Sequence, residues 1–108
     1  MVKVKIVYRG KDLESLEIKG HAGFAPYGED LVCGAVSIAS FGALNALEAI
    51  DDEFDYELDQ EAGLISLEAK GKLSEHDATV LEVLILQLKT VEASYPKNIA
   101  ITERKQAK

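Results

Sequence analysis

Two pairs of alternating hydrophobic and polar runs, each pair followed by a longer apolar segment, constrain the fold of this chain most. Hydrophobic residues occupy every second position of 2–8, and a second alternating run covers 13–18. A period of two residues is typical of a strand with one buried face. The sequence at 9–12 has the glycine and polar residues of a turn, so we expect a first β-hairpin.

The pattern repeats in the second half of the chain. Residues 54–58 alternate, residues 60–63 read as a turn, and residues 64–70 form the expected partner strand. Two more branched residues, Ile99 and Ile101, lie beyond the last proline and leave room for a short fifth strand. We therefore expect a second hairpin and a possible short final strand.

A helix is expected after each hairpin. The first runs from Leu31 to about Ile50, with Asp30 as its N-cap. The second runs over 75–94, opens on a variant capping box formed by Ser74 and Asp77, and is stopped by Tyr95-Pro96. The order strand, strand, helix, repeated once, predicts a two-layer α+β fold. It would have a mostly antiparallel sheet with two helices on one face, in one domain over 1–108.

The charge balance narrows the class of partner. The chain carries 19 acidic and 12 basic residues, a net charge of −7, and eight acidic side chains with no Lys or Arg fall between Glu48 and Ala62. Nucleic-acid contacts need clustered basic residues, so we expect no direct nucleic-acid binding. The acidic stretch is either a solvated surface or a means of steering a cationic partner.

Cysteine usage and hydropathy bear on the compartment. One cysteine allows no internal disulfide and suits a reducing cytoplasm. The first residues alternate like a strand and do not read as a secretion signal. The run 31–47 has no charge, but its glycines, serines and asparagine favour a buried helix over a membrane span.

One Cys and two His at unsuitable spacing predict no metal site, and we expect no cofactor.

The residues best suited to catalysis lie in one segment of the sequence. His21 is the second residue of an eleven-residue glycine-rich loop, Gly20–Asp30, and the single cysteine, Cys33, follows twelve positions after the histidine. With Asp30 as N-cap, Cys33 would lie in the first helical turn, where unpaired N–H groups favour a thiolate. A mobile loop could carry the imidazole to the thiol. The pattern predicts a cysteine nucleophile, although a buried structural thiol fits the same residues.

The amino-acid sequence of this segment contains specific motifs. Gly-His-Ala-Gly-Phe at 20–24, Gly-Glu-Asp-Leu-Val-Cys at 28–33 and Ala-Val-Ser at 35–37 resemble the ribosomal-processing cysteine protease family, Prp. The likeness extends along the whole chain. The resemblance implies that Cys33 is the nucleophile and His21 the general base, acid and proton donor, with Asp30 and Ser37 in support. Whether Asp30 orients the histidine or only caps the helix stays open, as does a plain helical role for Ser37.

The resemblance also implies a substrate. Family members remove a short N-terminal extension from a basic large-subunit ribosomal protein, L twenty-seven. Peptide contacts would come from the loop, with an apolar cleft near its two aromatic residues, and the candidate residues are Gly20, Gly23, Phe24, Tyr27 and Gly28. Two other functions remain possible, a thiol-based redox sensor and a noncatalytic ribosome-associated binding module.

The second predicted helix suggests self-association. Its apolar residues form more than the single stripe that packing on one sheet requires, and the surplus is Val80, Val83, Ile85 and Leu86. The excess predicts a homodimer, which the family resemblance also implies. His76, in the first turn of this helix, is expected at the surface. The loop 20–30 is expected to become ordered only when a peptide binds.

Overall fold

The computed structural model describes residues 1–20, 27–59 and 62–106, with backbone alone for 27–30. These residues form five strands and three helices. In chain order they are β1 (Val2–Arg9), β2 (Asp12–Lys19), α1 (Tyr27–Ala46), α2 (Ile50–Glu53), β3 (Phe54–Asp59), β4 (Leu64–Ala69), α3 (Glu75–Ser94) and β5 (Ile99–Gln106).

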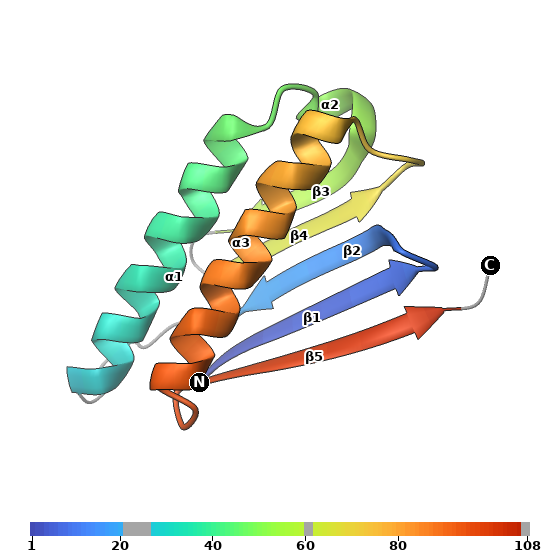
Figure 1. Cartoon of the computed structure of the whole chain (residues 1–108). Helices are drawn as coiled ribbons and strands as arrows, with labels where there is room; N and C mark the ends of the chain where they lie inside the picture. Colours follow the sequence, from blue (N-terminus) through green and yellow to red (C-terminus); the bar gives the residue numbers. More distant parts are fainter. Residues whose placement is uncertain (21–26, 60–61, 107–108) are drawn as a thin grey trace.

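One sheet contains all the described strands, in the order β3-β4-β2-β1-β5 (Figure 1). The two predicted hairpins are confirmed, and β2 also pairs antiparallel with β4. The possible fifth strand is confirmed but is longer than expected: β5 has eight residues and runs parallel to β1 along its full length. The sheet is therefore mixed. The parallel pair forms because α3 is the crossover that returns the chain to the start of β1.

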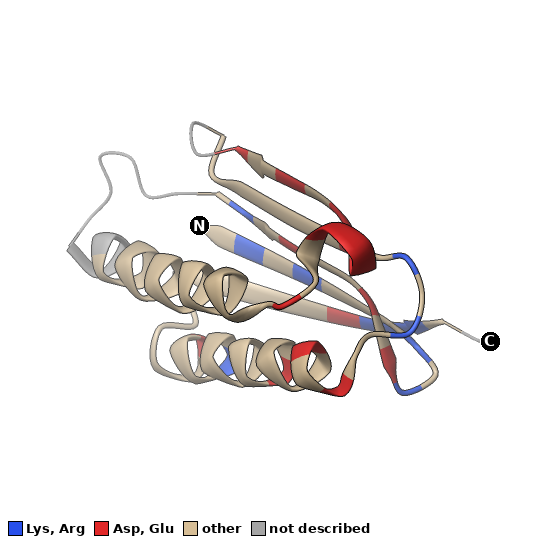
Figure 2. Cartoon of the chain, turned by 90° about the horizontal axis from the view of Figure 1, so that it is seen from above, with Lys and Arg blue, Asp and Glu red and all other residues tan. Residues whose placement is uncertain are grey.

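Both long helices lie on one face of the sheet, as Figures 1 and 2 show. Alternation in the strands turns one set of apolar side chains toward the helices, and α1 and α3 bury their own apolar stripes against it. Burial of each large aliphatic side chain contributes roughly 1.5–3 kcal/mol. The fully buried large side chains include Ile6, Leu16, Leu67, Leu81, Leu84, Leu88 and Ile99. No helix within the described ranges is long and apolar enough to cross a membrane.

Helix α1 differs from its prediction at both ends. It begins at Tyr27, so Asp30 is not its N-cap, and Cys33 lies in the second turn rather than the first. The glycine-rich composition before Asp30 is typical of a loop, yet the chain is already helical from Tyr27. At the other end α1 stops at Ala46, and a separate short helix, α2, contains Ile50. The described side chains do not include that of Asp30.

Helix α3 has its predicted bounds, and its N-cap is confirmed, because the Ser74 Oγ accepts the Asp77 N–H at 3.1 Å. The capping box, however, is shared between elements. The Asp77 carboxylate accepts the N–H groups of Glu48 at 2.9 Å and Ala49 at 3.2 Å, while Glu53 accepts the Ser74 N–H. Asp77 thus serves the start of α2, which has no side-chain cap of its own.

His76 makes a second link between the helices. Its Nε2 lies 2.9 Å from the Ala46 carbonyl oxygen at the end of α1. That hydrogen bond raises the pKa of His76, against the effect of desolvation, and Glu48 and Asp77 raise it further. The side chain is exposed, at 47%, which confirms the surface prediction. We call the residues Ala46, Glu48, Ala49, His76 and Asp77 the α1–α3 clasp.

Three members of the clasp place their ligand-type atoms within 4.8 Å of one another: Glu48, His76 and Asp77. Two of the three side chains, Asp77 and His76, already make structural hydrogen bonds. Both oxygens of Asp77 accept backbone N–H groups, and the His76 Nε2 donates to Ala46. This arrangement accounts for the cluster as a brace that fixes α1 on α3.

The surplus apolar residues of α3 do not share one surface. Ile85 is buried in the core at 5% exposure, so its expected place in a subunit interface is wrong. Val83 and Leu86 are exposed, at 48% and 56%, and Val80 is partly buried. Leu86 borders a hollow against the first hairpin, whereas Val80 and Val83 face α1. The core therefore contains Ile85, one more residue of α3 than the single apolar stripe predicted.

Candidate active site

Cys33 lines a cavity of about 280 Å³ between α1 and one end of the sheet. The thiol residue is partly buried and packs against the core. The other walls come from the start of β1, the end of β2 and the hairpin formed by β3 and β4. The lining is mostly apolar, and its apolar residues, including two from α1, are Val2, Ile18, Val36, Phe41, Leu58, Leu64 and Ile65.

Three polar residues of α1 follow one another along this cavity. Cys33, Ser37 and Ser40 are spaced at i, i+4 and i+7, which places them on one helix face. Ser37 is exposed, whereas Ser40 is fully buried and its Oγ has no hydrogen-bond partner among the described residues. A buried hydroxyl without a partner costs roughly 1–3 kcal/mol. The cavity therefore contains an unused polar group two turns beyond the thiol.

Gly20 fixes the chain at the other side of the cavity. Its φ of +109° lies in the region that favours glycine, and an added Cβ would meet the Met1 carbonyl oxygen at 2.6 Å. Its N–H donates to the Gly63 carbonyl at 2.9 Å, which ties the end of β2 to the turn before β4. No residue with a side chain fits here. His21 is the next residue in the chain.

The predicted site residues divide into three groups. Gly20, Cys33 and Ser37 share the cavity, so the structure brings them together. The backbone of Tyr27, Gly28 and Asp30 belongs to the start of α1 rather than to a loop. His21, Gly23 and Phe24 lie outside the described residues, as does most of the segment expected to order on binding. Their roles stay predictions.

Sequence reasoning missed the far wall of the cavity. Ser40 could have been found, because its i+7 spacing from Cys33 sets both on one face of a helix. Leu58 and Asp59 gave no such signal. They reach the cavity only because β3 and β4 lie beside β2 in the sheet, a pairing that the local pattern does not specify.

The cavity suits a reaction at the thiol with a polypeptide that inserts one side chain into it. A volume of about 280 Å³ is just below the roughly 300–1,000 Å³ of typical small-molecule pockets. Cys33 lies past the first turn of α1, so the expectation that free N–H groups at the helix end favour its thiolate is not met. The role of a base for a cysteine nucleophile stays a prediction for His21.

Comparison with known proteins identifies the family. Residues 1–100 match the family model described as cysteine protease Prp. The ribosomal processing cysteine protease Prp of Bacillus subtilis is 34% identical over 98 residues, covering 85% of this chain and 87% of that protein. The protein of the same name from Mycoplasma pneumoniae is 38% identical over 90 residues, covering 83% and 87%.

Solved structures agree with the sequence relatives. The essential ribosomal processing protease Prp from S. aureus, in complex with a substrate peptide, superposes with a TM-score of 0.84 at 25% identity, covering 95% of this chain and 99% of that one. SMU.848 from Streptococcus mutans gives 0.84 at 28% identity, covering 98% and 96%. This chain is therefore a member of the Prp family of ribosomal processing cysteine proteases.

Proposed function

We propose that this chain is a cysteine endopeptidase in which Cys33 attacks the substrate carbonyl and His21 transfers the protons. The observation that carries the proposal is the shared cavity. The single cysteine of the chain and Gly20, the residue next to His21, line the same space in a member of a cysteine protease family. Family membership favours peptide cleavage over a redox sensor or a noncatalytic binding module.

The proposed reaction has two stages. His21 accepts the Cys33 proton, the thiolate adds to the peptide carbonyl, and His21 then protonates the departing amine. Water hydrolyses the resulting thioester with the same imidazole as base and releases the N-terminal fragment. Ser37 lies one turn from Cys33 on the cavity side of α1, where its hydroxyl can hydrogen-bond near the sulfur. Asp30 would orient His21.

The proposed substrate is the short N-terminal extension of ribosomal protein L twenty-seven in the cytoplasm. The names of the similar proteins support ribosomal processing, and one structural neighbour is described with a substrate peptide. A net charge of −7 suits a basic ribosomal protein, because opposite charges accelerate encounter. The peptide would contact Gly20, Gly23 and Phe24 before α1, and Tyr27 and Gly28 at the start of that helix.

The test is processing of the precursor from the same organism. Purified chain is incubated with that protein carrying its N-terminal extension, and both products are identified by mass spectrometry. We expect one cut that frees the extension and leaves the mature protein intact. A precursor that stays uncut under conditions where the chain is folded would contradict the proposed substrate.

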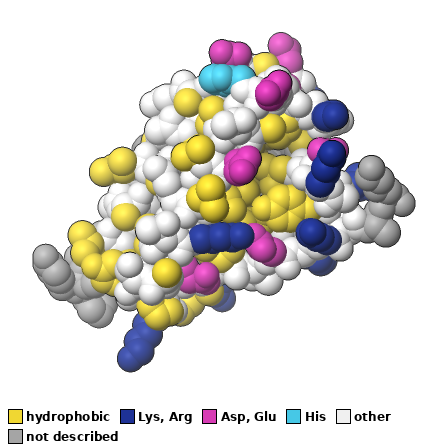
Figure 3. Space-filling model, in the orientation of Figure 1, with side chains coloured by type: hydrophobic (Ala, Val, Ile, Leu, Met, Phe, Trp, Pro, Cys, Tyr) yellow, Lys and Arg dark blue, Asp and Glu magenta, His cyan; other side chains and the backbone are white. Residues whose placement is uncertain are grey.

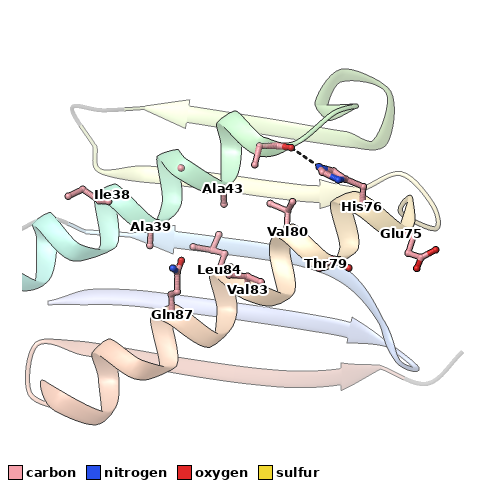
Figure 4. A pocket seen from close by; sticks show the side chains of 12 residues that line it. Ile38, Ala39, Ala43, Glu75, His76, Thr79, Val80, Val83, Leu84 and Gln87 are labelled. Carbon is pink, nitrogen blue, oxygen red and sulfur yellow. Dashed lines mark hydrogen bonds between the residues drawn. The ribbon is translucent and has the colours of Figure 1, made fainter.

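The chain is also proposed to form a homodimer through the outer faces of α1 and α3. A groove of about 760 Å³ separates the two helices, and small α1 residues such as Ala39 and Ala43 face Val80 and Val83 across it (Figure 4). Separate groups of hydrophobic side chains are visible over the two helices (Figure 3), and Ile38, which lines the groove, is 80% exposed. Exposed apolar surface of this kind is typical of a subunit interface.

Light scattering tests the dimer directly. We expect about twice the chain mass of 11.8 kDa at micromolar concentration. Val83→Asp should shift the protein toward monomer, because it adds a charge to the apolar groove. Glu82→Lys, an exposed change at the adjacent position, is the matched control and should leave the mass unchanged. A wild-type mass of 11.8 kDa at these concentrations would contradict the proposal.

A further inference from the structure

The outermost strand of the sheet leads directly to the Cys33 cavity. β3 pairs with β4 on one side, and its other edge pairs with no described strand. Its last two residues, Leu58 and Asp59, line the cavity that contains Cys33. β5, the strand at the opposite edge, contributes nothing to this cavity. An extended chain lying along β3 would therefore pass beside the thiol.

The side chains of β3 separate into two kinds. Tyr56 and Leu58 lie in register with Leu67 and Ile65, on the helix side of the sheet, but are 44% and 45% exposed. Helix α1 does not cover them at this edge. They leave an apolar ledge beside the strand that could receive every second side chain of an added strand. The Tyr56 hydroxyl donates to Asp51 at 2.9 Å, which holds the ring in place.

The opposite face of β3 is acidic. Asp55, Glu57 and Asp59 alternate along it, all exposed, and Figure 2 shows acidic residues along this edge strand and in α2 beside it. Asp55 lies directly opposite Glu68 of β4, a like-charge pair that destabilises a sheet. Acidic residues at a free edge also prevent self-association. A basic residue beside Asp55 would relieve the repulsion with Glu68.

We propose that the substrate binds by strand addition to the free edge of β3. This proposal rests on the proposed protease function and specifies how the substrate chain is held. The occupant is an extended segment of the processed polypeptide with alternating apolar and basic or polar residues. Its apolar side chains lie against Tyr56 and Leu58, and its basic side chains lie near Asp55 and Glu57. Backbone hydrogen bonds to β3 then deliver the scissile bond to Cys33.

Backbone methylation of the peptide tests the strand pairing. The probe is a fluorescein-labelled peptide with the extension sequence of the host's L twenty-seven, and its binding to full-length Cys33→Ala is measured by anisotropy. Each residue away from the scissile bond is N-methylated in turn. Because every second N–H of an added strand points at its neighbour, methylation should weaken binding roughly tenfold at alternate residues and little at the others.

Charge variants of the protein provide the second arm. Asp55→Asn combined with Glu57→Gln should weaken binding of the same peptide roughly threefold to tenfold at low salt. Glu82→Gln on α3 removes one charge from the opposite side of the sheet and should leave binding unchanged. The Asp55 change should also raise the melting temperature slightly, because it removes the repulsion with Glu68.

The outcomes separate the two proposals. If the wild-type chain does not cut the unmethylated peptide, the proposed function fails and this inference fails with it. If the peptide is cut but methylation acts equally at odd and even positions, strand addition alone is overturned. A loss of binding in Glu82→Gln equal to that of the β3 variant would overturn the placement of the basic residues at this edge.

Discussion

Replacing Cys33 with Ala is expected to lower kcat/KM for the extension peptide by at least about a thousandfold, and His21→Ala by a similar factor. The first change removes the atom that forms the thioester. The second removes the group proposed to deprotonate the thiol and to protonate the leaving amine. Initial rates with a peptide that spans the cleaved bond measure both effects.

The catalytic variants need to be shown folded. Cys33 is only partly buried, so its replacement with Ala should change the melting temperature little. Ser66→Ala, on β4 away from the cavity, is a matched control for a small polar truncation and should retain full activity. A folded Cys33→Ala protein with wild-type kcat/KM would rule out the nucleophile assignment.

The second large effect is expected on stability. Asp77→Ala should lower the free energy of unfolding by about 2–4 kcal/mol, because two backbone N–H groups lose hydrogen bonds to a charged acceptor. For a domain of this size, such a loss lowers the melting temperature by roughly 10 °C or more. The clasp would loosen where α1 meets α2 and α3, so α1, which contains Cys33, would lose one of its anchors.

The control for this prediction lies in the same turn. Glu75→Ala removes an exposed carboxylate from the start of α3 and should change stability by about 0.5 kcal/mol or less. Chemical denaturation of both variants and the wild type measures the difference. Equal stabilities of the Asp77 and Glu75 variants would show that the clasp does not brace the fold.

The clasp also gives the stability a pH dependence. Burial alone would raise the pKa of Asp77, but the N–H group of Glu48, together with Glu53, the N–H group of Ala49 and the His76 charge, outweighs it and holds the pKa below its ordinary value of 3.8. A lowered folded-state pKa means that the contribution is complete above the unfolded-state value and is lost as the pH falls through the folded value. The stability gap between wild type and Asp77→Ala should therefore narrow below about pH 4.

Local sequence patterns were sufficient to predict most helices and strands and their two-layer arrangement. Alternation identified both hairpins, and Ser74 marked the start of α3 correctly, because strand periodicity and N-capping depend on neighbours in sequence. The start of α1 was predicted wrongly because the local sequence signals were misleading there. Gly28 read as a loop residue, and Asp30 resembled an N-cap more closely than any residue before Tyr27.

Long-range pairing accounts for the remaining errors. Nothing near Ile99 indicates that β5 runs parallel to β1, since that partner lies almost a full chain length away. Asp77 looked like half of a local capping box, yet its carboxylate accepts the N–H groups of Glu48 and Ala49 in the connection between α1 and α2. The site follows the same rule. Cys33 and Ser37 were identified from sequence, whereas Leu58 at the cavity wall depends on the order of strands in the sheet.

The most direct test of the central claim is covalent capture of the nucleophile by a substrate-like peptide. A chloromethyl ketone that carries the extension sequence up to the cleaved bond is incubated with the wild-type chain, and intact mass and peptide mapping follow the product. We predict that one equivalent of peptide is attached to Cys33. Excess uncut substrate and the His21→Ala change should each slow this labelling. Labelling no faster than with a scrambled-sequence chloromethyl ketone would contradict the assignment of Cys33 as the protease nucleophile.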